Sequence, residues 1–376
     1  MIQVDNHSGL PHLLYEKCAP SGELFDILVL RGTFDFARDG APMTLAAEQR
    51  PILFGDRYDG PVSTQPLKAV IAEEGDLVLG KPRTDILIQG HLRSLRGRPL
   101  KHWLAEFKVG PVSKAIRVSG PRAVHESLTG WQLGEAAAVN QVPLDYRLAF
   151  GGCFYDPQPP AEGESAASIH YPTNPAGCGW LPTSSELTSL DKVARLRIEE
   201  RLSSIKQMPA PQLEDPQIPY KHPHQKLTPQ GCGPIARWWE PRVSLQGTYD
   251  QRWEEERYPF LPEDFDPRFY QSAPADLVSA SYLTGNELVQ LKGCLADGDC
   301  TMRLPGVVPL VVINENDPDG HIQIPPLDTV RIDLDNRQAI LLWRLPLARQ
   351  MTTNQLTVAL AAVSTQEQSG KRKSQA

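Results

Sequence analysis

Three carboxylates near position 264 have types and spacing that could perform chemistry. Glu263, Asp264 and Asp266 lie close together beside Phe265 and Phe269. Two carboxylic acids about 5–10 Å apart can hydrolyse a glycosidic bond. The same cluster is also typical of an ordinary structural corner. A carbohydrate- or peptidoglycan-active hydrolase is therefore an alternative function for this sequence, not the leading one.

A second stretch partly matches a phosphate-binding loop. Gly75 to Lys81 follows the beginning of the pattern G-x-x-x-x-G-K-S/T, but Pro82 stands where the hydroxyl residue that binds magnesium belongs. Leu77 to Leu79 favours a strand instead of a flexible cradle. We expect a strand end and a turn here, and no nucleotide site.

Metal ligands and nucleophiles are sparse in the sequence. His222, His224 and Cys232 could offer three ligands, but no C-x-x-C pair stands beside them to complete a zinc site. Cys294 and Cys300 flank an apparent hairpin loop, where two semi-buried thiols are the simplest interpretation. A G-x-S-x-G nucleophile elbow is absent. The sequence thus predicts no catalytic residue, no metal and no cofactor.

Four segments rich in Gly, Pro and aromatic residues differ from ordinary strands: 144–152, 171–180, 231–253 and 261–276. Glycine permits close backbone approach, and proline stiffens long connections. Tyr, Trp and Arg are the side chains that anchor protein interfaces. Either these loops pack between two β regions, or they form a partner-binding groove.

The elements that must position these segments are mainly strands. Residues 24–148 and 238–363 contain short apolar runs with regular turn signals, which is typical of a sandwich or barrel. We predict two β-sandwich- or barrel-like regions, joined by a Pro/Gly-rich irregular middle. The expected division is an N-terminal β domain at 1–148, a connection at 149–237, a C-terminal β domain at 238–363 and a disordered tail at 364–376.

One amphipathic helix is expected in the middle segment, at about 184–207. Its apolar residues recur at spacings of three and four, as on one face of a helix. They are Leu187, Leu190, Ala194, Ile198, Leu202 and Ile205. Thr183 and Glu186 have the spacing of a capping box at the start of this helix, and Pro209 follows its end.

Composition narrows the class of protein. The 376 residues include 38 basic and 45 acidic side chains, a net charge of −7, which argues against a nucleic-acid-binding surface. No apolar run approaches the roughly 20 residues that span a bilayer, and the first residues do not read as a signal peptide. Six cysteines in a chain this long do not indicate a disulfide framework. We expect a cytoplasmic protein that binds neither membrane nor nucleic acid.

Several ordered motifs together resemble a known family. They include Val29-Leu-Arg-Gly-Thr-Phe-Asp-Phe36, Lys81-Pro-Arg-Thr-Asp-Ile-Leu-Ile-Gln-Gly90, Ala149-Phe-Gly-Gly152, Asn174-Pro-Ala-Gly-Cys-Gly179, Gly233-Pro234, Gly247-Thr-Tyr-Asp250, Pro262-Glu-Asp-Phe-Asp-Pro-Arg-Phe269, Leu327-Asp-Thr-Val330 and Trp343-Arg344. In this order they resemble the accessory proteins encoded beside spike genes in bacterial type VI secretion clusters, a family catalogued as a domain of unknown function. The resemblance covers most of the chain.

The resemblance implies a non-enzymatic cytoplasmic adaptor or chaperone. Such a protein would bind a type VI effector, often one with a PAAR-like domain, and assist its loading onto the VgrG spike. A structural component of the secretion apparatus is a further alternative, and it should assemble without effector. The expected partner-binding residues are Asn174, Gly177, Gly179, Trp180, Trp239, Arg242, Tyr249, Asp264, Phe265, Asp266, Arg268 and Phe269.

Overall fold

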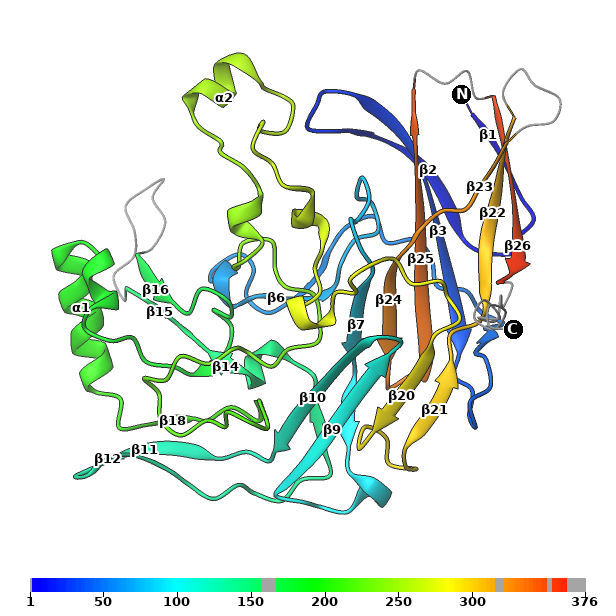
Figure 1. Cartoon of the computed structure of the whole chain (residues 1–376). Coiled ribbons are helices and arrows are strands. Elements are labelled where there is room, and N and C mark those ends of the chain that lie inside the picture. Colours follow the sequence, from blue (N-terminus) through cyan, green and yellow to red (C-terminus); the bar gives the residue numbers. More distant parts are fainter. Residues whose placement is uncertain (1, 157–166, 315–320, 350–353, 364–376) are drawn as a thin grey trace, which may run out of the picture.

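The computed structural model describes residues 2–156, 167–314, 321–349 and 354–363. Within these residues the protein is mainly β, as the sequence predicted, and it contains two α-helices (Figure 1). The expected disordered tail at 364–376 lies outside the described residues. No helix of the described part is long and apolar enough to cross a membrane.

A six-stranded sheet forms the centre of the molecule. Its order is β2-β3-β25-β24-β7, and the short β4 pairs with β3 at one end. The strands are β2 (His12–Cys18), β3 (Leu24–Asp35), β4 (Thr44–Leu45), β7 (Asp85–Gln89), β24 (Leu327–Asp333) and β25 (Gln338–Ala348). β7 and β24 are parallel, whereas β3 and β25 form a long antiparallel pair.

The two faces of this sheet differ in character because successive side chains of a strand point to opposite faces. On β3, Leu28, Leu30 and Phe34 face the main core. Arg31, on the opposite face, is 1 % exposed although it is charged. The segment between β4 and β7 covers that face and makes it part of the interior.

Two further sheets enclose the main core against the six-stranded sheet. The five-stranded sheet has the order β19-β10-β9-β20-β21, and the four-stranded sheet has the order β1-β26-β22-β23. Their strands are β9 (His102–Val109), β10 (Val112–Ser119), β19 (Leu213–Glu214), β20 (Leu288–Lys292), β21 (Cys300–Arg303), β1 (Gln3–Asn6), β22 (Val307–Asn314), β23 (His321–Gln323) and β26 (Gln355–Ala362). All three sheets contribute buried side chains to one cluster, with Phe107, Val311 and Trp343 among them.

The strand-rich segments expected at 1–148 and 238–363 do not form separate sheets. β3 and β7 from the first segment pair with β25 and β24 from the second. β9 likewise pairs with β20 in the five-stranded sheet. The long loops between these strands bring distant parts of the chain together, which local turn signals cannot reveal.

The middle of the chain builds a lobe around α1 (Lys192–Ser203), seen on the left of Figure 1. Its strands form one three-stranded sheet and several two-stranded ladders. They are β11 (Ala123–Ser127), β12 (Gly130–Leu133), β18 (Gln207–Pro209), β14 (Phe150–Gly151), β17 (Cys178–Gly179), β15 (Cys153–Tyr155) and β16 (Ser168–His170). Two other ladders, β5 (Arg57–Asp59) with β6 (Val70–Glu73) and β8 (His91–Arg93) with β13 (Gln141–Pro143), lie nearer the central sheet.

The expected helix is present but shorter than the predicted 184–207. Ala194 and Ile198 are buried in the core of the lobe, as the periodicity indicated. The backbone N–H of Thr183 donates to Glu186 at 2.7 Å, so the capping contact forms, but it begins the short 3₁₀ helix Glu186–Ser189. The N-cap of α1 is Asp191, whose carboxylate accepts from two backbone N–H groups.

Candidate functional site

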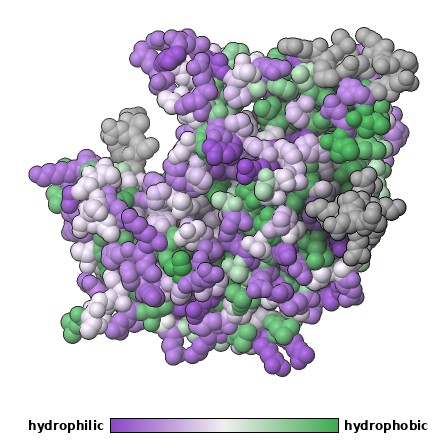
Figure 2. All heavy atoms as spheres, in the orientation of Figure 1, coloured by the Kyte–Doolittle hydropathy of each residue, from purple (hydrophilic) through white to green (hydrophobic). Residues whose placement is uncertain are grey.

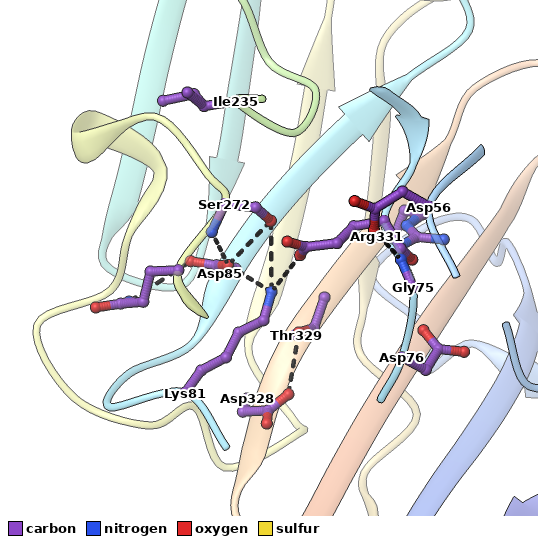
Figure 3. A network of polar contacts seen from close by, with 12 residues as sticks. Asp56, Gly75, Asp76, Lys81, Asp85, Ile235, Ser272, Asp328, Thr329 and Arg331 are labelled. Carbon is purple, nitrogen blue, oxygen red and sulfur yellow. Dashed lines mark hydrogen bonds and ion pairs between the residues drawn. The ribbon is translucent and has the colours of Figure 1, made fainter. Parts of the chain in front are cut away.

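A buried charge network lies on the covered face of the six-stranded sheet (Figure 3). It contains five cations and five carboxylates, and all of them are buried except Glu73, which is half-buried. The cations are Arg31, Lys81, Arg242, Arg331 and Arg344, and the carboxylates are Glu73, Glu74, Asp76, Asp85 and Asp328. Since buried charges are stable only when paired and hydrogen-bonded, this balance of signs is expected.

The arginines of the sheet bind carboxylates from the covering segment. Arg31 donates to Asp76 at 2.6 Å, and Arg331 pairs with Glu73 at 3.0 Å. Arg344 pairs with Asp328 on the neighbouring strand, and its Nε donates to the backbone oxygen of Asp76 at 2.9 Å. These contacts attach the segment between β4 and β7 to the central sheet.

Lys81 joins the two remaining carboxylates. Its amine lies 3.0 Å from Glu74 and 2.7 Å from Asp85, and Figure 3 shows Ser272 on the same amine. Burial alone would raise the pKa of Glu74, but Lys81 and Arg242 outweigh burial and hold this pKa below its ordinary value. Lys81 is therefore occupied inside the protein, and Leu77 to Leu79 form a loop instead of the expected strand.

Arg242 connects the network to the segment that follows the lobe. Its guanidinium donates to Glu74 at 2.8 Å, to the backbone oxygen of Ile235 at 2.7 Å and to that of Phe269 at 2.9 Å. It also lies over the ring of Phe269, 5.3 Å from the ring centre. Ser272 donates its backbone N–H to Asp85 at 2.8 Å. Both ends of the excursion between Arg242 and Ser272 are thus fixed to the network.

The outer part of this excursion, residues 247–264, is an arm. It projects from the top of the molecule in Figure 1 and carries α2 (Gln251–Glu256). Its two sides close together at the base, where Asp264 accepts from the backbone and the hydroxyl of Thr248 at 2.9 and 2.8 Å. Gly247 adopts φ +82°, and a Cβ there would lie 2.7 Å from Pro262. The close approach therefore requires glycine.

Aromatic side chains occupy the outer part of the arm. Trp253 stacks edge-to-face on Tyr249 and Tyr258, with ring centres 4.7 and 5.7 Å apart, and its Nε1 donates to the backbone oxygen of Phe260 at 2.8 Å. Tyr258 is 69 % exposed and Phe260 is 41 % exposed. Large aromatic residues held this rigidly in solvent are suited to contact another protein.

The same arm is strongly acidic. It contains six carboxylates, namely Asp250, Glu254, Glu255, Glu256, Glu263 and Asp264, against Arg252 and Arg257. The end of the molecule over α2 is accordingly hydrophilic in Figure 2. A hollow of about 400 Å³ lies on the arm and is lined by Trp253, Pro262 and several of these charges. The arm therefore offers aromatic contacts inside a negatively charged rim.

The twelve residues predicted to bind a partner fall into three groups by burial. The buried ones are Asn174, Gly179, Trp180, Trp239, Arg242 and Phe265, and the half-buried ones are Gly177, Asp266 and Phe269. Tyr249, Asp264 and Arg268 are exposed. The structure brings Tyr249 and Asp264 together on the arm and Asp266, Arg268 and Phe269 at its base, whereas Asn174, Gly177, Gly179 and Trp180 belong to the lobe.

The buried members of this set hold the fold. Asn174 donates to the backbone oxygens of Tyr146 and Phe150 at 2.8 and 3.1 Å. Gly177 must be small, since a Cβ would lie 2.5 Å from the Asn174 amide. Trp239 is 1 % exposed and donates to the backbone oxygen of Leu67. Substitution of Trp239 or Phe265 would consequently test folding as well as binding.

Sequence reasoning missed the buried charge network and the outer aromatic residues Tyr258 and Phe260. Arg31, Arg331 and Arg344 occupy strand positions that alternate with apolar ones, a pattern usual for a solvent-facing side. The signal that could have found the network was the number of such charged strand positions together with Lys81 and Asp85 in one motif.

The remaining candidate groups for chemistry are the carboxylates near position 264, possible metal ligands and the cysteines. The carboxylates of Asp264 and Asp266 have pKa values lowered by hydrogen bonds from Thr248 and Arg268 respectively, so neither is poised to donate a proton at neutral pH. Among the described residues no three His, Cys, Asp or Glu side chains are placed to hold a metal ion. All six cysteines are free, and burial raises the pKa of Cys232 to about 12.

Comparison with known proteins gives one match. A family model described as "Uncharacterized protein conserved in bacteria (DUF2169)" matches residues 23–344, from β3 to β25. No curated protein and no solved structure matches the chain. The matched region includes the whole buried charge network and the arm. The chain therefore belongs to this conserved bacterial family, DUF2169.

Proposed function

We propose that the protein is a non-enzymatic cytoplasmic adaptor that binds a type VI secretion effector, often one with a PAAR-like domain, and assists its loading onto the VgrG spike. The type VI role is suggested by the ordered motifs from Val29 to Arg344 described above. The observation that carries the binding role is the arm, whose exposed aromatic side chains project from a base fixed by buried charges.

Rigidity at the base and exposure at the tip are what a docking element needs. Trp253 packs between two tyrosines and is hydrogen-bonded to Phe260, so little side-chain freedom is left to lose when a partner binds. Tyr258 and Phe260 remain in solvent and can bury a large apolar area. We infer that the effector contacts the tip of the arm.

Co-purification from the native host tests this proposal. The tagged protein and its Tyr258→Ser/Phe260→Ser variant would be isolated, and bound proteins would be identified and quantified by mass spectrometry. We expect a toxin-like or PAAR-like protein with the wild type, VgrG in smaller amount, and at least about tenfold less of this client with the variant, the effect of losing an aromatic hot spot.

A matched control is Leu128→Ser/Leu196→Ser, which removes two exposed apolar side chains from the lobe instead of the arm. This variant should recover the client at the wild-type level. Equal recovery with the arm variant would show that the tip is not the binding surface. A partnerless wild-type protein would refute the adaptor function itself.

A further inference from the structure

A second charged surface lies on the outer face of the five-stranded sheet. Along β9 the residues Ala105, Phe107 and Val109 are buried in the main core, so the alternate residues point outward. The outward positions of β9, β10, β20 and β21 make up this basic face. They are His102, Leu104, Glu106, Lys108, Ser113, Ala115, Arg117, Ser119, Leu288, Gln290, Lys292, Thr301 and Arg303.

Strand register places the cations on one face of the sheet, with no two of them directly opposite. Lys108 lies opposite Gln290, and Glu106 lies opposite Lys292, with which it forms an ion pair at 3.4 Å. Arg117 lies opposite Leu104 on the neighbouring strand. A hollow of about 280 Å³ follows these strands and is lined by Glu106, Lys108 and Lys292, among others.

The positive charge of this face is not neutralised within the protein. Glu106 is the single carboxylate on these four strands, and it pairs with Lys292. Glu214 of the neighbouring β19 lies opposite Arg117, but it is buried and pairs with Arg122. Lys108, Arg117 and Arg303 form no ion pair with any described residue, so most of the positive charge of this face stays unpaired.

The sequence contains the same imbalance. Residues 91–122 include eight Lys or Arg residues and one Glu, in a chain whose net charge is −7. Internal pairing explains four of these cations, because Arg93 binds Asp335, Lys101 binds Glu135, Lys114 binds Asp276 and Arg122 binds Glu214. The remaining excess faces solvent. An unneutralised cluster of this kind attracts an oppositely charged surface and accelerates its association.

The basic face and the acidic arm lie at opposite ends of the molecule. In Figure 1 α2 is at the top, whereas β9, β10, β20 and β21 are at the bottom. A single partner patch of uniform charge cannot complement both surfaces. The protein therefore has two separate surfaces for partners of opposite charge.

We propose that the basic face binds an acidic protein segment, and that this segment belongs to a second partner, distinct from the one on the arm. A protein is favoured over nucleic acid because the outward positions include no Phe, Tyr or Trp on which a base could stack, and the one imidazole, His102, lies at the end of β9 within 2.9 Å of the Ser119 hydroxyl. The 46 % exposed Leu104 and the central Glu106 also suit a mixed protein surface. The adaptor would in this way hold two partners at once.

Binding of labelled poly-L-glutamate to the full-length protein tests the basic face without knowledge of the natural partner. Fluorescence anisotropy would be measured at about 50 mM and about 200 mM salt, since screening weakens such contacts. The variant Lys108→Glu/Arg117→Glu/Lys292→Glu should bind about tenfold more weakly than wild type at the lower salt. The control Lys17→Glu/Lys192→Glu/Lys221→Glu makes the same change of charge at exposed sites elsewhere and should stay within about twofold.

Each further outcome is decisive. The neutral variant Lys108→Gln/Arg117→Gln/Lys292→Gln should show an intermediate loss, which separates the charge effect from any failure to fold. Equal binding by both triple Glu variants, or no binding of poly-L-glutamate by wild type, would overturn the proposal. Tighter binding of duplex DNA or of phosphatidylserine vesicles through the same three residues would assign the face to nucleic acid or membrane instead. The arm variant Tyr258→Ser/Phe260→Ser should bind poly-L-glutamate normally, so failure at one surface is distinguishable from failure at the other.

Discussion

The buried charge network and the arm are built from the same kinds of residue but use them in opposite ways. In the network, arginines and carboxylates are nearly inaccessible and paired, as with Arg31 and Asp76 at 2.6 Å. In the arm, six carboxylates stand against two arginines, and the aromatic tip is in solvent. The charges of the network position the chain, whereas the charges of the arm are exposed to solvent.

Aromatic residues show the same contrast. Trp239 lies in the Gly/Pro-rich segment 231–253, and Tyr258 lies between that segment and the next, so the two look similar in the sequence. Trp239 is 1 % exposed and packs edge-to-face on Tyr146, whereas Tyr258 is 69 % exposed. Residue type and local composition therefore do not separate an exposed aromatic residue from a core residue. Burial, which depends on distant parts of the chain, separates them.

The largest expected effect comes from breaking the network at its only lysine. Lys81→Met leaves Glu74 and Asp85 buried without the amine that both of them contact. Removal of one partner of a buried ion pair costs about 3–5 kcal/mol, so we expect a loss of that size in the free energy of unfolding. Urea denaturation monitored by tryptophan fluorescence measures it.

The control for this change is Lys192→Met at the exposed start of α1, which should alter the free energy of unfolding by no more than about 0.5 kcal/mol. A Lys81→Met protein as stable as the wild type would show that the network does not hold the arm's base. The buried charge network would then not be the structural region that the comparison with the arm requires.

The pH dependence of stability tests a single charge of the network, the carboxylate of Glu74. The pKa of Glu74 is held below its ordinary 4.5 in the folded state, mainly by Lys81 and Arg242 against the effect of burial. The ionised carboxylate therefore stabilises the fold above about pH 4.5, and this contribution is lost as the pH falls towards the lower folded-state pKa. Glu74→Gln should lose stability at neutral pH and show a flatter decline below about pH 4.5.

The expected difference is about 2–3 kcal/mol over the two pH units below about pH 4.5, since one extra proton bound by the unfolded state is worth about 1.4 kcal/mol per pH unit. Urea midpoints of wild type and Glu74→Gln would be compared at about pH 6 and about pH 2.5. The variant Glu254→Gln, an equivalent change on the exposed arm, serves as the control. Parallel pH profiles for wild type and Glu74→Gln would contradict the assignment of Glu74 as a charged member of the network.

The helix and the mainly β class could be predicted because their signals are local. The spacing of Ala194, Ile198 and Leu202 defines one face of a helix wherever it packs, and Ala194 and Ile198 are buried while Leu202 packs against the core of the lobe. The pairing of β3 with β25 could not be predicted in this way. The two strands are about 300 residues apart, and neither contains a sequence signal that identifies its partner strand. Local turn signals therefore identify the strands but not the sheets that the two strand-rich segments share.

The candidate site was predictable only in part, for a related physical reason. The segments around Tyr249 and Asp264 were recognised by composition, and both residues lie on the arm. The charged positions of β3, β24 and β25 looked like a solvent side, because alternation does not show whether a second layer covers that side. Only the folded course of residues 46–84 over the sheet makes Arg31 and Arg331 interior.

The smallest expected effect concerns Gly247, which lies at the junction between the network and the arm. Gly247 closes the base of the arm at φ +82°, with Pro262 2.7 Å from the position of a Cβ. Gly247→Ala should therefore break the hydrogen bonds between Thr248 and Asp264 and lower the free energy of local unfolding of the arm by about 1–2 kcal/mol. The network should keep its contacts. Hydrogen exchange of the arm's amides should become faster without a comparable change in the central sheet.

Gly22→Ala isolates the cause of this effect. Gly22 has nearly the same φ, +87°, but a Cβ there meets no atom within 4 Å. Both variants introduce the backbone strain, and only Gly247→Ala adds the collision with the other side of the arm. Faster exchange confined to the arm in Gly247→Ala, and absent from the arm in Gly22→Ala, would show that the arm opens locally on a base that stays fixed. If Gly247→Ala instead loosened β7 and β24 as well, the arm and the network would be one cooperative unit, and partner binding at the tip would be coupled directly to the stability of the central sheet.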